Sequence, residues 1–117
     1  PTQIAVITGA GAGIGRAAAR ALGRAGFDIA LLGRNEDRLK ETAENLAKHS
    51  VRSLVIPLDV SDAKAVQDAA ERIETELGPI SVWANCAGAT VVGQVAALSA
   101  DDRIAFNHIH IRMLRHK

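Results

Sequence analysis

Four glycines occupy every second position just after the first apolar run of the chain. They are Gly9, Gly11, Gly13 and Gly15, and they follow the apolar stretch QIAVIT at residues 3–8. Ordering so many glycines costs more conformational entropy than ordering any other residue type. Apolar residues then recur at helical spacing from Ile14 onward. The pattern predicts a tight turn that joins a buried strand to a helix.

The rest of the chain repeats this change from strand to helix. Further apolar runs predict buried strands at residues 27–33, 51–60 and 80–88. Helices are expected after each of them, with N-terminal caps at Asn35, Ser61 and Ser99 and the last helix over 99–116. Strands that are apolar throughout are typical of a parallel sheet covered on both faces. We therefore expect an α/β fold over residues 1–117, a Rossmann-type doubly wound parallel sheet in the order 3-2-1-4. We expect this partial domain to be truncated after its fourth strand and fourth helix.

The place of the glycines, between the first strand and the first helix, predicts a binding site for a nucleotide pyrophosphate. Free N–H groups and the positive end of the helix dipole favour phosphate at such a turn. The spacing is T-G-x-x-x-G-x-G, beginning at Thr8, rather than the G-x-G-x-x-G of the common dinucleotide loop, and no Walker lysine follows. The residues expected to bind the cofactor here are Gly9, Gly11, Ala12, Gly13, Ile14 and Gly15, although Gly11 has no specific role. An ordinary glycine-rich turn is the alternative.

Two further motifs follow the glycines in order along the chain. Asp59 stands in LDV after the third expected strand, and NCAG follows the fourth at Asn85–Gly88. With the glycine turn, these motifs resemble the short-chain dehydrogenase/reductase family from the first strand into the expected last helix. The resemblance implies that Asp59 contacts the adenine and that Asn85 braces the turn after the fourth strand. It also implies cofactor contacts from Val60, Ala87 and Gly88.

Cys86 departs from the family pattern, which usually has asparagine at that position. As the only cysteine it forms no disulfide within the chain and no structural cysteine zinc site. A single thiol is consistent with a reducing, cytoplasmic compartment. We expect Cys86 to be a small buried hydrophobe rather than a reactive thiol, because no basic residue lies near it in the sequence.

The residues after the second expected strand bear on the choice of cofactor. An acidic residue at that place binds the ribose 2′-hydroxyl of NAD. This chain instead has Gly33 and Arg34, followed by Asn35. Arginine can pair with a 2′-phosphate through two hydrogen bonds and stack on the adenine. NADP(H) is therefore favoured over NAD(H), with Arg34 and Asn35 in the cofactor site. The alternative is that Arg34 is a surface arginine at a helix start.

The family reaction uses a serine and a Tyr-x-x-x-Lys set, and the resemblance ends before them. The chain contains no tyrosine, and Lys117 is its last residue. A further catalytic asparagine of the family falls on Asn107, or nearer His110 if the count begins at Ser99. The resemblance implies an NADP(H)-dependent oxidoreductase that interconverts a carbonyl and an alcohol, with residues 1–117 inactive by themselves. A non-catalytic nucleotide-binding module or an inactive fragment is the alternative.

Composition disfavours several other partners. The net charge is only +1, so no large electrostatic field indicates nucleic acid or a membrane surface. No metal site is expected from His108, His110 and His116, because residues two apart on a helix do not face one another. A small-molecule substrate remains as the expected partner. Homo-oligomers are expected through the open edge of the fourth strand, because an unpaired apolar edge tends to pair with another chain.

Overall fold

Strands and helices alternate along the chain, as the sequence pattern indicates. The computed structural model describes residues 2–86 and 110–113. Its elements are β1 (Ile4–Thr8), α1 (Gly13–Arg24), β2 (Asp28–Gly33), α2 (Glu36–Ala47), β3 (Ser53–Pro57), α3 (Ala63–Glu76), β4 (Ile80–Asn85) and β5 (His110–Met113). The sheet order is β3-β2-β1-β4-β5, and the first four strands are parallel. The expected doubly wound sheet in the order 3-2-1-4 is confirmed.

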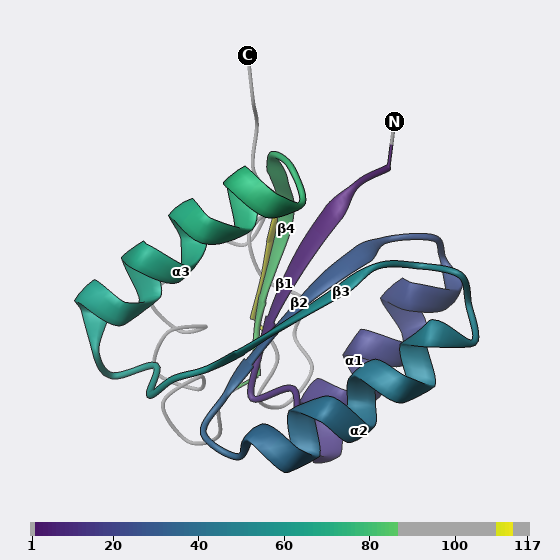
Figure 1. Ribbon diagram of the computed structural model, residues 1–117, viewed down its shortest axis with the longest axis horizontal. Coiled ribbons are helices and arrows are strands. Elements are labelled where there is room, and N and C mark those ends of the chain that lie inside the picture. Colours follow the sequence, from purple (N-terminus) through teal and green to yellow (C-terminus); the bar gives the residue numbers. More distant parts are fainter. Residues whose placement is uncertain (1, 87–109, 114–117) are drawn as a thin grey trace.

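Helices cover both faces of the sheet. Figure 1 shows α1 and α2 on one face and α3 on the other. Alternate residues of β1 divide between two buried clusters, with Ala5 and Ile7 on the α1/α2 side and Ile4 and Val6 on the α3 side. All of β1 is buried, which explains why the strand reads as a continuous apolar run rather than as an alternating one.

The second and third helices begin at side-chain caps. Asn35 accepts a hydrogen bond from the backbone N–H of Arg38 at 3.2 Å, so the expected cap of α2 is confirmed. The cap of α3 is Asp62, which accepts from the N–H of Ala65 at 3.1 Å. The expected cap at Ser61 is wrong by one residue, because the Ser61 hydroxyl donates to the carboxylate that precedes it in the loop.

The structure corrects the expected last helix over 99–116, because its residues His110–Met113 form the strand β5. This strand pairs antiparallel with β4, from Val82 opposite Met113 to Asn85 opposite His110. Backbone groups on the outer edge of β4 need partners, and strand pairing supplies them where a helix would not. The expectation of an open edge on β4 is therefore wrong over these residues, and the self-association inferred from that edge loses its basis.

Two glycines let α1 pack closely against its neighbours. A Cβ on Gly15 would lie 2.0 Å from the carbonyl oxygen of Gly9, which belongs to the backbone of the preceding turn. A Cβ on Gly23 would lie 2.5 Å from Cδ2 of Leu46, which is the end of a flexible side chain. The first contact can be relieved only by moving the turn, whereas the second needs only a side-chain adjustment.

We predict that Gly15→Ala lowers the free energy of unfolding by about 1–3 kcal/mol, the usual cost of overpacking. This loss occurs even though alanine favours a helix over glycine by roughly 1 kcal/mol. Gly23→Ala in the same helix is the matched control and should cost less, since Leu46 can move. Urea unfolding followed by circular dichroism measures both. A Gly15→Ala variant as stable as the wild type would contradict the close approach.

Candidate functional site

A cavity of about 390 Å³ opens at the carboxyl edge of the sheet. The turn after β1, the loop and first helical turn after β2, and the loop after β3 enclose it. Its lining residues are Gly9, Gly11, Ala12, Gly33, Arg34, Asn35, Arg38, Leu39, Leu58, Asp59, Val60 and Ser61. These segments meet because β1, β2 and β3 are parallel neighbours, so their carboxyl ends lie at one edge. The structure therefore brings expected residues from three separate motifs to one cavity: Gly9, Gly11, Ala12, Arg34, Asn35, Asp59 and Val60. The other expected residues that the structure describes, Gly13, Ile14, Gly15 and Asn85, are not among those that line it.

The turn after β1 takes a backbone shape that requires glycine at two positions. Gly9 has φ of 65° and Gly13 has φ of 56°, both in the left-handed region. The N–H of Ala10 donates to the carbonyl oxygen of Leu32 at 3.2 Å, which ties the turn to β2. Helix α1 then begins after Ala12, with no side-chain cap and no acidic residue in its first turn. Its positive end is therefore left for an external anion, whereas α2 and α3 have capping side chains.

Gly11, which has no role in the sequence pattern, makes room for α2. A Cβ on Gly11 would lie 3.0 Å from the Cβ of Arg38. The buried hydroxyl of Thr42 donates to the carbonyl oxygen of Ala10 at 3.0 Å, with the carbonyl oxygen of Arg38 at 3.2 Å as a second acceptor. Arg38 and Thr42 therefore hold α2 against the glycine turn, and neither was identified from the sequence. The one signal in the sequence is their spacing: Arg38 and Thr42 are four residues apart and therefore lie on the same face of α2.

The ends of β1 and β4 are joined through Thr8. Its hydroxyl donates to Oδ1 of Asn85 and accepts from the backbone N–H of Cys86 at 3.0 Å. Thr8 is only 2% exposed, so its hydroxyl is shielded from water. Asn85 thus braces the end of β4 against β1.

Cys86 lies in the buried cluster on the α1/α2 side, so the expectation of a buried hydrophobe is confirmed. Burial raises the pKa of its thiol to about 11. The thiol is therefore protonated near neutral pH, where a nucleophilic role would need the thiolate.

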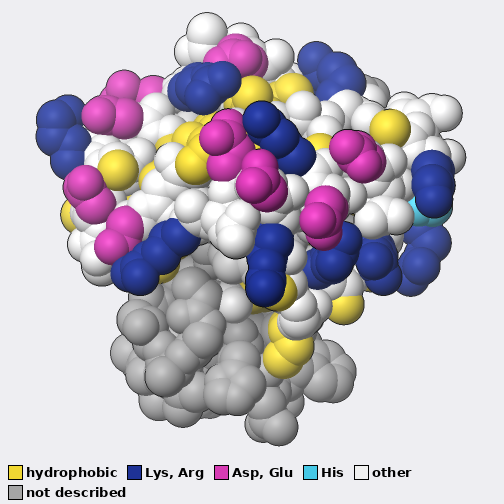
Figure 2. Space-filling model, turned by 60° about the horizontal axis from the view of Figure 1, so that its bottom comes forward, with side chains coloured by type: hydrophobic (Ala, Val, Ile, Leu, Met, Phe, Trp, Pro, Cys, Tyr) yellow, Lys and Arg dark blue, Asp and Glu magenta, His cyan; other side chains and the backbone are white. Residues whose placement is uncertain are grey.

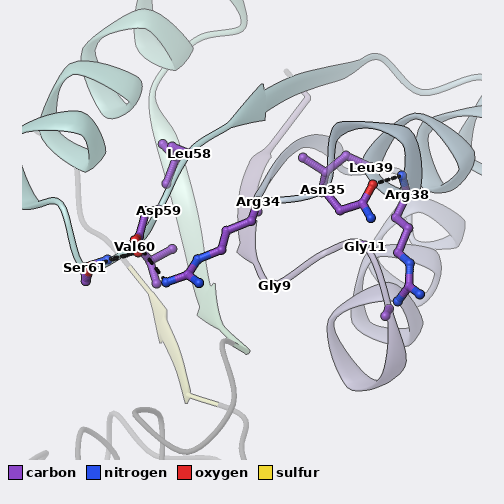
Figure 3. A pocket seen from close by; sticks show the side chains of 12 residues that line it. Gly9, Gly11, Arg34, Asn35, Arg38, Leu39, Leu58, Asp59, Val60 and Ser61 are labelled. Carbon is purple, nitrogen blue, oxygen red and sulfur yellow. Dashed lines mark hydrogen bonds and ion pairs between the residues drawn. The ribbon is translucent and has the colours of Figure 1, made fainter.

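Asp59 is held by three hydrogen bonds. Its Oδ1 accepts from the backbone N–H of Ser61 at 2.9 Å and from the Ser61 hydroxyl at 2.8 Å. Its Oδ2 accepts from Nη2 of Arg34 at 3.0 Å. These bonds hold the pKa of Asp59 below its ordinary value of 3.8. The largest contribution comes from the Ser61 N–H, followed by the Ser61 hydroxyl and then the Arg34 guanidinium. Figure 3 shows Arg34 reaching from the end of β2 toward Asp59.

The ion pair between Arg34 and Asp59 is open to solvent. The Arg34 side chain is 78% exposed and that of Asp59 is 44% exposed. Exposed pairs of this kind contribute little to stability because water screens them. The guanidinium of Arg34 can therefore form new hydrogen bonds to a ligand at little cost to the fold.

Charges elsewhere on this side of the molecule are mixed. Figure 2 shows basic and acidic side chains interspersed over the face that it presents. With a net charge of +1 over the whole chain, attraction for an anion has to come from local groups at the cavity. The start of α1 and the arginines that line the cavity are such groups.

Several expected site residues cannot be placed. Ala87, Gly88 and Asn107 lie outside the described residues, as do His108 and His116. Within residues 2–86 and 110–113, no group of three or more His, Cys, Asp or Glu side chains could hold a metal ion. None of the helices in this described part is long and apolar enough to cross a membrane.

Comparison with known proteins gives matches along most of the chain. A family model described as short chain dehydrogenase matches residues 3–112. The 2,3-dihydro-2,3-dihydroxybenzoate dehydrogenase of Bacillus subtilis is 37% identical over 100 residues, which are 86% of this chain and 38% of that protein. The chain thus spans well under half the length of this curated relative.

Solved structures give similar matches. An alcohol dehydrogenase from the archaeon Thermococcus sibiricus, complexed with 5-hydroxy-NADP, is 39% identical with a TM-score of 0.65, over 69% of this chain and 35% of that one. The L-sorbose reductase from Gluconobacter frateurii, complexed with NADPH and L-sorbose, is 36% identical with a TM-score of 0.70, over 74% of this chain and 34% of that one.

We predict that Ser61→Ala raises the pKa of Asp59, because the variant loses the hydroxyl bond but keeps the backbone N–H bond. A lowered pKa means that the carboxylate stabilises the fold above its ordinary pKa and that this contribution is lost as the pH falls through the lowered value. In the variant this contribution should therefore be smaller, and its loss should be complete at a higher pH than in the wild type. Carbon-13 NMR of the Asp59 carboxyl group measures the titration. Ser53→Ala on β3 is the control, and an Asp59 titration identical in Ser61→Ala and wild type would refute the assignment.

Proposed function

The chain belongs to the short-chain dehydrogenase family, a family of oxidoreductases, and from this premise we propose that residues 1–117 form its NADP(H)-binding domain. The whole protein would interconvert a carbonyl and an alcohol on a small-molecule substrate. The observation that carries the proposal is the cavity at the carboxyl edge, where the glycine turn, Arg34 and Asp59 meet. When bound, a nicotinamide cofactor supplies or accepts the hydride.

The glycine turn has the features that a pyrophosphate needs. The uncapped start of α1 offers N–H groups and the positive end of the helix dipole to the phosphate oxygens. The positive φ angles of Gly9 and Gly13 shape the turn. The close approach at Gly15 sets α1 against the end of β1. We assign pyrophosphate contacts to the backbone of this turn, over Gly9, Gly11, Ala12, Gly13, Ile14 and Gly15.

The loops after β2 and β3 fit the adenosine half of the cofactor. We assign the adenine to Asp59 and Val60, where the carboxylate can accept from the exocyclic amine and the valine can contact the ring. Arg34 and Asn35 line the cavity from the loop after β2. The lowered pKa of Asp59 supports this role, because the carboxylate stays charged and accepts hydrogen bonds throughout the neutral range.

The nicotinamide half is assigned to the end of β4. Asn85 fixes the end of this strand through Thr8, and the family motif continues to Ala87 and Gly88. A rigid strand end helps to position a cofactor ring for hydride transfer, because small displacements of the reacting atoms slow a reaction strongly.

The preference for NADP(H) rests on the residues after β2. Gly33 and Arg34 provide no carboxylate that would bind a ribose 2′-hydroxyl or repel a 2′-phosphate. Arg34 is exposed at the cavity and can pair with a phosphate. Two of the structural relatives were solved with NADPH or an NADP derivative, which supports the same choice.

Catalysis is assigned to none of the residues described. Residues 1–117 contain no tyrosine, so the acid–base step that the family resemblance gives to a tyrosine has no candidate among them. We therefore propose that these residues by themselves bind the cofactor without converting substrate. A dedicated non-catalytic module is less favoured, because the relatives compared above are dehydrogenases and reductases.

The single free thiol supports a reducing, cytoplasmic location.

We predict that the chain binds NADPH more tightly than NADH and that Arg34→Ala removes most of this difference. Losing a charge-assisted hydrogen bond should weaken NADPH binding by about tenfold or more and leave NADH binding nearly unchanged. Isothermal titration calorimetry measures both affinities. Arg72→Ala on α3 removes an equal charge far from the cavity and is the control. Equal affinities for the two cofactors, unaltered in Arg34→Ala, would overturn the proposed preference.

A further inference from the structure

A second arginine lines the cavity on the side away from Asp59. Figure 3 shows Arg38 beside Gly11, whereas Arg34 points toward Asp59. Arg34 is paired with that carboxylate at 3.0 Å, but Arg38 makes no ion pair with any carboxylate of the described residues. The guanidinium of Arg38 therefore remains available for an anion in the cavity.

The stem of Arg38 is held in place by contacts from both directions. Its backbone N–H donates to Oδ1 of Asn35 at 3.2 Å, which fixes it in the first turn of α2. Its Cβ lies so near the glycine turn that a Cβ on Gly11 would be 3.0 Å away. The bond from Thr42 to the carbonyl oxygen of Ala10 holds the same two segments together. A side chain at Gly11 would push Arg38 away from the turn, so this glycine admits the arginine.

The charges that line the cavity indicate which group could bind an anion there. Among the described residues that line the cavity, Asp59 is the only acidic one, and its charge is opposed by that of Arg34. These two groups together therefore offer little net attraction. A phosphate monoester carries roughly −1.5 to −2 charges at neutral pH, because its second pKa is about 6. A cation that is not paired with a protein carboxylate would complement such a group, and Arg38 is the lining residue that can supply it.

We propose that Arg38 is a second determinant of cofactor specificity, which binds the 2′-phosphate from the glycine-turn side while Arg34 binds it from the β3 side. This inference rests on the proposed preference for NADP(H). It adds a residue that the motif after β2 does not contain, and it gives Gly11 the role of making space for that residue.

The test compares two adenosine fragments that differ only in the 2′-phosphate. Binding of 2′,5′-ADP and of 5′-ADP to the chain is measured by calorimetry for wild type, Arg38→Gln and Arg38→Lys. Lys48→Gln removes an equal charge at the other end of α2 and is the matched control. We expect Arg38→Gln to weaken 2′,5′-ADP binding by about tenfold and to leave 5′-ADP binding unchanged. The affinity of Arg38→Lys for 2′,5′-ADP should lie between those of the wild type and Arg38→Gln, because lysine keeps the charge but not the planar fork of the guanidinium.

The outcomes separate this inference from the proposal beneath it. Equal binding of both fragments by the wild type would overturn the NADP(H) preference itself. A wild type that prefers 2′,5′-ADP, with the same preference in Arg38→Gln, would overturn the role of Arg38 alone. Equal weakening of both fragments by Arg38→Gln would also overturn it, since Arg38 would then act on the adenosine or on the fold. Thermal melting of each variant shows whether the fold is retained.

Discussion

The burial of β1 between β2 and β4 is the constraint on which the rest of the structure depends. The strand is buried along its whole length and pairs in parallel with both neighbours, so their carboxyl ends meet at one edge. The glycine turn after β1 must then leave the sheet and start α1 at once, in the small space that Gly15 leaves beside Gly9. The cavity exists because three such turns open at the same edge.

Positive and negative groups are placed unequally around that cavity. The start of α1 has neither a side-chain cap nor an acidic first turn, and Arg38 makes no ion pair among the described residues. Asp59, in contrast, is held by Ser61 and by Arg34. A ligand with several phosphates and an adenine amine matches this distribution, with the phosphates toward the helix start and the arginines and the amine toward the carboxylate.

Much of the fold follows from local patterns, because buried parallel strands are apolar throughout and helix caps are read from single residues. The tight turn at the glycines, the cap at Asn35 and the order of the first four strands are predicted in this way. Contacts between distant segments are not predicted by such local patterns. Gly11 meets Arg38 only once α2 packs on the turn. Likewise, β5 pairs with the edge of β4 although the apolar spacing of its segment is helical. Ser61 was misassigned for a similar reason, since its hydroxyl has a better acceptor in Asp59.

The central claim is that the carboxyl edge of the sheet binds an adenosine with a 2′-phosphate. The most direct measurement is a two-dimensional nitrogen-15 NMR titration of the chain with 2′,5′-ADP, which reports on each backbone N–H separately. The account predicts shifts that are concentrated at the glycine turn from Gly9 to Gly13 and in the loop of Asp59 and Val60. Shifts that instead gather at the opposite edge, around the ion pair of Asp28 and Arg52, would contradict it.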